Sequence, residues 1–447
     1  MGSAQNNSIC SLSIVGLLFF SIFTQAQQTT PAAATISLSE AIHRAQANEP
    51  AFANAVAAQK SASIDRYLAK ATLLPTVVYH NQMLYTQPNG QTNQGGQGAT
   101  QSAPIFIANN AIHEYMSQAT INETIGLKQF ADTRVASAVS ARASAELEVT
   151  RRGLVSAVVA LYYEVATTQT KQRLLIEAVL EAQSFTKLTQ DRENAREVAH
   201  ADVLKAQLQQ QQRERDLSDA VLAANRARLE LAVLLFPDPR TSYSTEPAGA
   251  PPPLPTQDEV NKLASANNPE IRSALADIQA SNAEVSSAKA AYLPDLGLNF
   301  TYGIDAPQFA KYGPDGIHNL GYSISGTLDI PVWDWLSTQK RIKQSEIRRD
   351  AARVSLTATQ RRLIATLEET YAEASAARLQ MDLLDRSVLT AEESLRLTKL
   401  RYANGEATAL EVVDAQNAFL TSGTAQADGV VRYQSALATL QILTGTL

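Results

Sequence analysis

Residues Arg401–Gln416 read RYANGEATALEVVDAQ and lie between two long stretches with a helical pattern. Asn404 and Gly405 both tolerate the positive φ that ends a helix, so they predict a turn. Glu411 and Asp414 follow on the returning helix, three residues apart and therefore on one face. The stretch predicts the tip of a helical hairpin that carries two acidic side chains.

The helix that leads into this turn carries a heptad pattern. Small and apolar residues recur in alternating steps of four and three at Leu363, Leu367, Thr370, Ala374, Ala377, Met381, Leu384, Val388, Ala391, Leu395, Thr398 and Tyr402. Such a pattern without proline predicts left-handed coiled-coil packing. A helix of roughly 60 residues, from near Trp335 to Asn404, would be about 90 Å long at 1.5 Å per residue.

The chain contains an internal repeat. Residues 45–75 match residues 264–294 without a gap, at a constant offset of 219 (294 − 75). Further along the offset is 209 (371 − 162), as in Tyr162 with Tyr371 and Arg192 with Arg401. We therefore predict a structural duplication.

Each copy predicts the same order of elements, namely short helix, strand, loop, strand, long helix, turn and long helix. The first repeat is expected to span 36–236, with its strands and loop at 76–125 and its hairpin at 126–236. The second is expected to span 257–447, with its strands and loop at 295–330 and its hairpin at 335–447. The proline-rich stretch 237–256 between them is expected to be an extended linker. A Gly/Gln/Asn-rich loop at 87–100 accounts for the ten additional residues of the first copy.

Two stretches of the second copy alternate strictly between apolar and polar residues. Apolar side chains occupy the even positions of 296–304 and 319–330, whereas residues 111–125 of the first copy alternate poorly. Strict alternation predicts strands with one apolar and one polar face. A transmembrane barrel strand needs roughly 9–11 such residues. A soluble sheet packed on a helical core is the alternative.

Four amphipathic strands per chain are too few to close a barrel, because bacterial barrels begin at about eight strands. Open strand edges are not tolerated in lipid. A membrane interpretation therefore requires an oligomer, in which two chains would supply eight strands and three chains twelve.

Residues 1–26 are expected to be a secretory signal peptide. Ser11–Phe23 is the only long apolar run, and the small-residue cleavage pattern Thr24-Gln25-Ala26 follows it. No Lys or Arg precedes the run, so an uncleaved anchoring segment is the alternative. The single cysteine, Cys10, would leave with the signal peptide.

The composition and motifs exclude several classes of function. A formal net charge of -6 argues against a nucleic-acid partner. The five histidines are scattered without an HExxH motif or a triad-like partner, and no GxxxxGK[ST] loop is present. We therefore predict no enzyme, no metal site and no cofactor, and a hydrolase is the least favoured function.

Four features point to one family: the doubled order of elements, the paired AKAxxxLP segments, the passage Ile330–Trp335, and Arg401–Gly405 running into Glu411–Gln416. In these features the chain resembles the TolC-like outer-membrane factor family, from about Leu38 to Leu447. The resemblance implies an α+β membrane protein. Long antiparallel coiled-coil helices would form an α-barrel tunnel through the periplasm, and a homotrimer would close a twelve-stranded β-barrel in the outer membrane.

The resemblance also implies a function. Such proteins are passive exit ducts of tripartite efflux or type I secretion systems, which dock onto a periplasmic adaptor protein and an inner-membrane transporter. The helix tips would form a gated periplasmic aperture. A periplasmic or surface coiled-coil scaffold without a pore is the alternative, although a scaffold has no reason to present the apolar face of 296–304 to lipid.

Two groups of residues acquire roles through this resemblance. Tyr402, Glu411 and Asp414 fall on positions that line or lock the aperture, and the turn Asn404-Gly405-Glu406 falls where the adaptor docks. Threefold symmetry would turn the acids into rings of carboxylates, which favour cations. The alternative is that both acids solvate a coiled-coil face.

The tip of the first hairpin differs, because Arg196 stands where the second hairpin has Gly405. We hypothesise that Arg192 or Arg196 supplies the positive partner of Glu411 or Asp414 in the second hairpin. Charge reversal at Arg196 would then raise the conductance. Asp202, the counterpart of Glu411, is expected to add a third acid to the ring.

Overall fold

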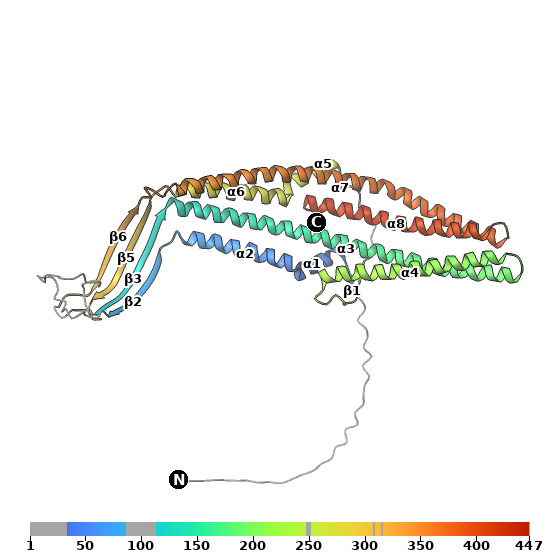
Figure 1. Cartoon of the computed structure of the whole chain (residues 1–447), viewed down its shortest axis with the longest axis horizontal. Helices are drawn as coiled ribbons and strands as arrows, with labels where there is room; N and C mark the ends of the chain where they lie inside the picture. Colours follow the sequence, from blue (N-terminus) through green and yellow to red (C-terminus); the bar gives the residue numbers. More distant parts are fainter. Residues whose placement is uncertain (1–33, 86–112, 247–251, 307–308, 314–315, 447) are drawn as a thin grey trace, which may run out of the picture.

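The computed structural model describes residues 34–85, 113–246, 252–306, 309–313 and 316–446. The expected signal peptide at 1–26 and the expected loop at 87–100 lie outside these ranges. The described chain is elongated, with a small sheet at one end and the tips of two helical hairpins at the other (Figure 1). The functional residues proposed from the sequence therefore lie far from the strands.

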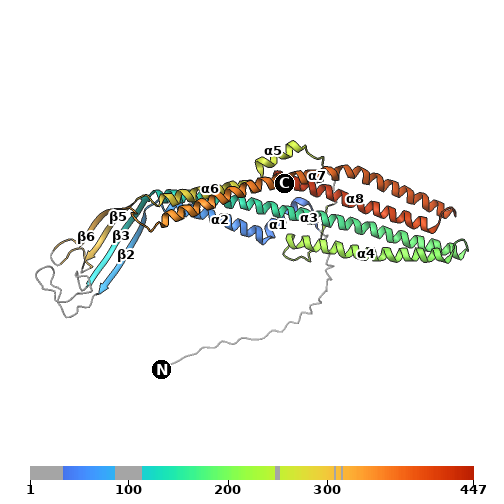
Figure 2. The same ribbon diagram turned by 45° about the horizontal axis from the view of Figure 1, so that its top comes forward.

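Two long helical hairpins form the greater part of the molecule. The first joins α3 (Leu127–Asn194) to α4 (His200–Leu235), and the second joins α7 (Ser337–Ala403) to α8 (Ala409–Thr444). The hairpins lie side by side in two views (Figures 1 and 2). Because α3 has 68 residues and α7 has 67, each is about 100 Å long at 1.5 Å per residue. Within the described ranges, no helix combines the length and the apolar character that crossing a bilayer requires.

The heptad seam predicted for α7 is buried. Eight of its twelve positions are buried and the other four are half-buried, the buried ones being Leu363, Leu367, Ala374, Ala377, Met381, Ala391, Leu395 and Tyr402. Because several of these residues are alanines, the helices approach closely, and the core is a narrow line along each hairpin. The prediction of coiled-coil packing is confirmed for this helix.

Each copy begins with two helices where the sequence predicted one short helix. The first copy has α1 (Leu38–Asn48) and α2 (Pro50–Ala71), and the second has α5 (Gln257–Asn267) and α6 (Pro269–Ala290). Proline lacks an amide proton and disfavours the helical conformation in the residue before it, so Pro50 and Pro269 each separate two helices. The Asn268 side chain accepts a hydrogen bond from the amide of Ile271 (3.0 Å) and so caps the new helix.

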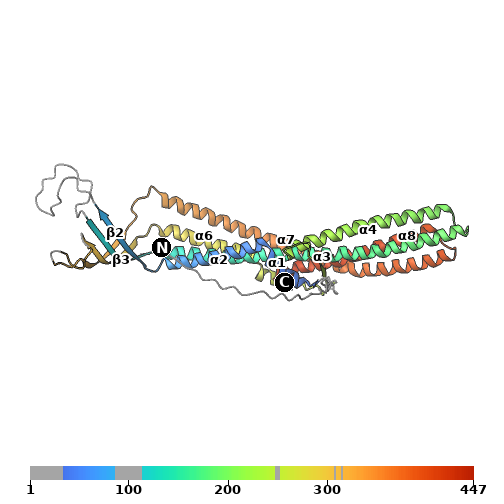
Figure 3. The ribbon, with the colours of Figure 1, turned by 90° about the horizontal axis from the view of Figure 1, so that it is seen from below.

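The sheet has four antiparallel strands in the order β2-β3-β5-β6. They are β2 (Thr76–Tyr85), β3 (His113–Gly126), β5 (Asp295–Ala306) and β6 (Leu320–Asp329). Strands of both repeats thus share one sheet, and β3 and β5 join the two copies at its centre. The outer strands β2 and β6 each have one edge without a partner strand among the described residues. Figure 3 shows the sheet beyond the end of the helices.

One face of this sheet is apolar and exposed. In β5 the even residues Leu296, Leu298, Phe300 and Tyr302 are exposed while the odd residues between them are half-buried, as the alternation predicted. The register pairs Phe300 with Ile121 of β3 and with Ile324 of β6, so the apolar rows continue across the strands.

The weakly alternating strand β3 is nevertheless a full partner in the sheet. Its Ser117 hydroxyl donates to Asn81 of β2 (2.8 Å) and lies 2.8 Å from the hydroxyl of Tyr79. These polar groups satisfy one another on the face that is otherwise apolar. Ser117, which interrupts the apolar pattern of β3, is therefore accommodated by polar groups of the neighbouring strand β2.

The linker expected at 237–256 is partly ordered and packed, which corrects its description as a simple extended connection. Its β4 strand (Tyr243–Thr245) pairs in parallel with β1 (Ala34–Ile36). The Tyr162 hydroxyl donates to the carbonyl of Ile36 (3.0 Å) and accepts from the amide of Glu246 (3.1 Å). Its repeat counterpart, Tyr371, donates to the carbonyl of Pro255 (3.2 Å). Equivalent tyrosines thus fasten the segments that begin both repeats.

A buried arginine joins the middle of α3 to the ends of two other helices. Arg152 donates to Glu148 (2.8 Å), to the carbonyl of Ile442 in α8 (3.0 Å) and to the carbonyl of Asn267 in α5 (3.1 Å). A positive charge at helix C-termini is favourable because it complements the helix dipole. A hydrogen bond from Arg151 lowers the pKa of Glu148 from 4.5 to about 2. Burial opposes this shift, and a hydrogen bond from Arg152 adds to it.

This carboxylate predicts a dependence of stability on pH. Because its folded pKa lies below its unfolded pKa, the stabilisation is complete above about pH 4.5 and is lost as the pH falls toward 2. Allowing for partial exposure, we expect it to contribute on the order of 2 kcal/mol at neutral pH. Glu148→Gln should therefore lower the free energy of unfolding at pH 7 but not at pH 2, as measured by urea denaturation. An equal loss at both pH values would contradict the assignment.

Candidate functional site at the hairpin tips

The tip of the second hairpin closes with a Schellman turn. The amide of Gly405 donates to the carbonyl of Tyr402 (3.0 Å), and the amide of Glu406 donates to the carbonyl of Arg401 (2.8 Å). The turn requires a left-handed residue, and Gly405 has a φ of 79°. Asn404, Gly405 and Glu406 are all exposed, as a docking surface requires.

The first hairpin closes with the same turn. The amide of Arg196 donates to the carbonyl of Glu193 (2.7 Å), and the amide of Glu197 donates to the carbonyl of Arg192 (2.9 Å). Arg196 has a φ of 62° and so takes the left-handed position that Gly405 occupies at the other tip. The two tips share one backbone conformation and differ in their side chains.

This equivalence predicts opposite effects of two substitutions. A residue with a Cβ atom costs about 1–2 kcal/mol in the left-handed conformation, whereas glycine does not. We therefore expect Arg196→Gly to stabilise the first tip by about 1 kcal/mol and Gly405→Ala to destabilise the second by a similar amount. Amide hydrogen exchange in the last turn of α3 and of α7 measures both effects. Faster exchange at the first tip of Arg196→Gly would refute the expectation.

Tyr402 does not line an open space but is buried between the two hairpins. Its side chain is 2% exposed, its hydroxyl donates to the Thr189 hydroxyl (3.1 Å), and its ring lies 5.2 Å from that of Phe185. Thr189 and Phe185 belong to α3, whereas Tyr402 belongs to α7. The residue expected to line or lock an aperture therefore joins the second hairpin to the first within one chain.

Arg192 strengthens the same contact from the first hairpin. Its guanidinium carbon lies 4.9 Å from the centre of the Tyr402 ring, and its Nη1 donates to the Tyr402 carbonyl. Its Nε donates to Glu197 (2.9 Å), which orients the side chain. The cation thus stacks on an aromatic ring and binds a carbonyl near the C-terminus of α7, two favourable interactions. We call Tyr402, Arg192, Phe185 and Thr189 the tip clamp.

Glu411 has a local structural role. It forms a capping box with Thr408, in which the Glu411 carboxylate accepts from the Thr408 amide (3.1 Å) and the Thr408 hydroxyl accepts from the Glu411 amide (3.3 Å). Arg401 of the same hairpin lies 3.3 Å from this carboxylate. Hydrogen bonds from the Thr408 backbone and side chain, with Arg401, hold the pKa of Glu411 below its ordinary value.

The pairing hypothesised between the arginines of the first hairpin and the acids of the second is not formed within the chain. Arg192 pairs with Glu197, and Glu411 pairs with Arg401. Asp414 is exposed on α8, without an ion pair in the described part of the chain. Asp202 is half-buried in the first turn of α4, 3.7 Å from Lys205. The cationic partners of Glu411 and Asp202 are therefore residues of their own hairpins.

Sequence analysis missed Phe185 and Thr189. Both face Tyr402 because they are one helical turn apart on α3, and Thr189 precedes Arg192 by three residues on the same face. The internal repeat could have indicated that both residues lie on a long helix, but not that they contact Tyr402. Among the described residues, no three His, Cys, Asp or Glu side chains are grouped so that they could hold a metal ion.

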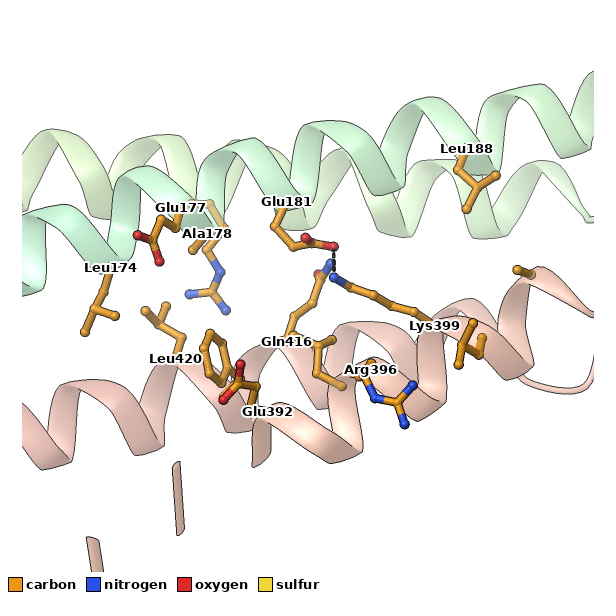
Figure 4. A pocket seen from close by; sticks show the side chains of 15 residues that line it. Leu174, Glu177, Ala178, Glu181, Leu188, Glu392, Arg396, Lys399, Gln416 and Leu420 are labelled. Atoms are coloured by element: carbon orange, nitrogen blue, oxygen red, sulfur yellow. Dashed lines mark ion pairs between the residues drawn. The ribbon is translucent and has the colours of Figure 1, made fainter. Parts of the chain in front are cut away.

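A cavity of about 660 Å³ separates the hairpins beyond the tip clamp (Figure 4). Apolar residues such as Leu174, Leu395 and Phe419 line it. Lys399 of α7 and Glu181 of α3 bridge it with an ion pair of 2.6 Å. The hairpins are thus packed at the clamp and more loosely joined behind it.

Residues 260–446 match the family described as "Outer membrane efflux protein". The second repeat of the chain resembles that family. Outer membrane protein OprJ of Pseudomonas aeruginosa is 26% identical over 172 residues, which cover 38% of this chain and 36% of OprJ. Protein CyaE of Bordetella pertussis is 25% identical over 404 residues, which cover 87% of this chain and 79% of CyaE. The chain thus spans about a third of OprJ and most of CyaE.

The fold of the chain agrees with those of solved structures. The CmeC outer membrane channel of Campylobacter jejuni aligns with a TM-score of 0.77 over 99% of this chain and 94% of that chain, at 16% identity. That identity establishes the fold alone. The fold is that of outer-membrane channel proteins, and the resemblance to the TolC-like family is confirmed.

Proposed function

We propose that three copies of the chain form a passive exit duct that crosses the outer membrane and continues as a helical tunnel in the periplasm. The observation that carries this proposal is the sheet with an apolar face, whose edge strands β2 and β6 each have one side without a partner strand in the described part of the chain. Unpaired edges are unstable in lipid because their amide and carbonyl groups find no water. Pairing β6 of one copy with β2 of the next closes a barrel, and three copies supply twelve strands.

The opposite face of the sheet suits a water-filled interior. The Asn299 side chain of β5 donates to the Asn122 side chain of β3 (2.5 Å), and Thr301 donates to Asn299 (3.0 Å). A polar interior with an apolar exterior is the arrangement of an aqueous barrel in a membrane. A coiled-coil scaffold, the alternative function, has no use for either face.

Two protein partners complete the proposal. The sequence has no phosphate-binding loop, so energy would come from an inner-membrane transporter. The exposed turn at Asn404, Gly405 and Glu406 lies at the end of the molecule farthest from the sheet (Figure 1), where a periplasmic adaptor protein would reach it.

The tip clamp is the proposed gate of this duct. It holds the second hairpin against the first through Tyr402 and Arg192. Separating the hairpins would widen the periplasmic aperture, and the cavity behind the clamp leaves room for this movement. Asp414 and Asp202 of three copies would add negative charge around the opening, whereas Glu411 mainly caps α8.

Membrane extraction tests the duct against the scaffold. The duct predicts that the protein stays in the membrane fraction after carbonate treatment, dissolves in detergent and has the mass of three chains there. A scaffold predicts release by salt or carbonate. Release of the full-length protein by carbonate would overturn the proposed function.

A further inference from the structure

The connection between β6 and α7 exposes an unusual concentration of large apolar side chains. Val332 is 89% exposed, Trp333 is 67% exposed and Trp335 is 86% exposed. The two indole rings contact each other edge to face, with centroids 5.9 Å apart. The other described residues leave these surfaces uncovered, so their apolar area faces outward.

The backbone of this connection is strained in a way that maintains the exposure. Trp335 has a φ of 58° and Leu336 a φ of 63°, so two consecutive residues other than glycine are left-handed. Asp334 holds the segment by accepting a hydrogen bond from the amide of Thr338 at the start of α7 (2.7 Å). Such conformations persist only where the surrounding structure fixes them, and they cluster at functional sites.

Exposed apolar residues occur at all four connections between the sheet and the helices. Leu74 lies at the α2–β2 connection, Leu127 after β3, and Tyr292 before β5, each about half exposed or more. The four connections lie at one level along the molecule (Figure 1). Because β3 and β5 are central strands, a neighbouring copy at the sheet edge would not cover Leu127 and Tyr292. The exposed apolar side chains therefore follow all four connections and are not confined to one edge of the sheet.

Cationic residues lie one or two turns of helix from this level. Lys70, Lys289, Lys340 and Arg341 are exposed, and none has an ion pair within the described ranges. Cations beside amphipathic aromatic rings suit the boundary between hydrocarbon and anionic phosphate groups. Tryptophan is enriched at this boundary, because its ring is apolar and its N–H is polar.

We propose that the segment Ile330–Leu336 is a lipid-binding anchor that seats Trp333 and Trp335 in the phospholipid interface on the periplasmic side of the outer membrane. The apolar sheet face ends at this level and the long helices begin there, so the anchor sets the depth at which the protein sits. The inference rests on the proposed membrane insertion of the sheet, and it is independent of the proposed gate.

The tryptophans provide a direct test, because Trp333 and Trp335 are the only two in the chain. Full-length protein is reconstituted into phosphatidylcholine vesicles with bromine atoms near the headgroup end of the acyl chains. We expect its tryptophan emission to fall at least twofold relative to unbrominated vesicles, with less quenching by bromines at the chain ends. Trp333→Phe and Trp335→Phe assign the signal to each ring.

Two patterns of quenching would overturn the anchor alone. Quenching by aqueous acrylamide without quenching by bromine would place the rings in water, and quenching by neither would place them between copies of the chain. Single-channel conductance of the same preparation separates this failure from that of the duct, since a conducting protein with unquenched tryptophans loses only the anchor. Protein that does not float with vesicles would overturn both proposals.

Discussion

Replacing Tyr402 by alanine is expected to open the duct. The substitution removes a buried ring that contacts Phe185 and Arg192, and truncating a buried aromatic side chain costs about 3–5 kcal/mol. In the proposed gate these contacts belong to the closed arrangement of the hairpins, so the loss would fall on the closed state. Because about 1.4 kcal/mol is a factor of ten, the ratio of open to closed channels should rise on the order of a hundredfold or more. Single-channel recording in planar bilayers measures this ratio.

Two conservative variants control for this result. Tyr402→Phe keeps the packing and removes only the hydrogen bond to Thr189, which is worth about 1 kcal/mol, so a much smaller increase is expected. Tyr433→Phe removes an equally buried hydroxyl, which donates to the carbonyl of Pro252 (2.8 Å) away from the tips. It should leave the open fraction unchanged. If Tyr402→Ala conducted like the wild type, the tip clamp would not be the gate.

Reversing the charge of Arg192 is expected to act in the same direction. Arg192→Glu removes the cation from the Tyr402 ring, removes the hydrogen bond to its carbonyl and places two carboxylates together at Glu197. A hydrogen bond to a charged group contributes about 1.5–3 kcal/mol, so the ratio of open to closed channels should rise roughly tenfold to a hundredfold. The open probability and the mean open time in planar bilayers check this expectation.

Arg196→Glu is the matched control, because it makes the same charge change at the same tip. Arg196 determines the turn through its backbone and makes no ion pair with another described residue. We expect its effect to be within about twofold, on the scale of exposed charges. This reverses the expectation from sequence that charge reversal at Arg196 would raise the conductance. An effect of Arg196→Glu as large as that of Arg192→Glu would show that net charge matters and the clamp does not.

The periodic features of the fold were predictable because a single element reveals them. The heptad seam of α7 and the alternation of β5 depend only on which residues each element buries. Both patterns can therefore be recognised in the sequence without knowing which other elements pack against them. The break before Pro269 was also legible in principle, since proline disfavours a helical residue before it. Strand β3 was obscured by Ser117, whose polar partner Asn81 lies on another strand.

The clamp could not be predicted in the same way. Resemblance singled out Tyr402, but its burial depends on Phe185 and Thr189, which another hairpin supplies. Arg192 was paired with the acids by charge alone, although the carbonyl and ring of Tyr402 and the nearby Glu197 are its partners. Contacts between distant helices depend on their relative rotation, and no local pattern records it.

In the proposed function the chain forms a water-filled channel that is closed by its hairpin tips. Single-channel recording of the purified detergent-soluble oligomer, wild type beside Tyr402→Ala, tests it most directly. We expect discrete current steps that are rare in the wild type and frequent in Tyr402→Ala. The absence of discrete steps in both proteins, from preparations that contain the three-chain species, would contradict it.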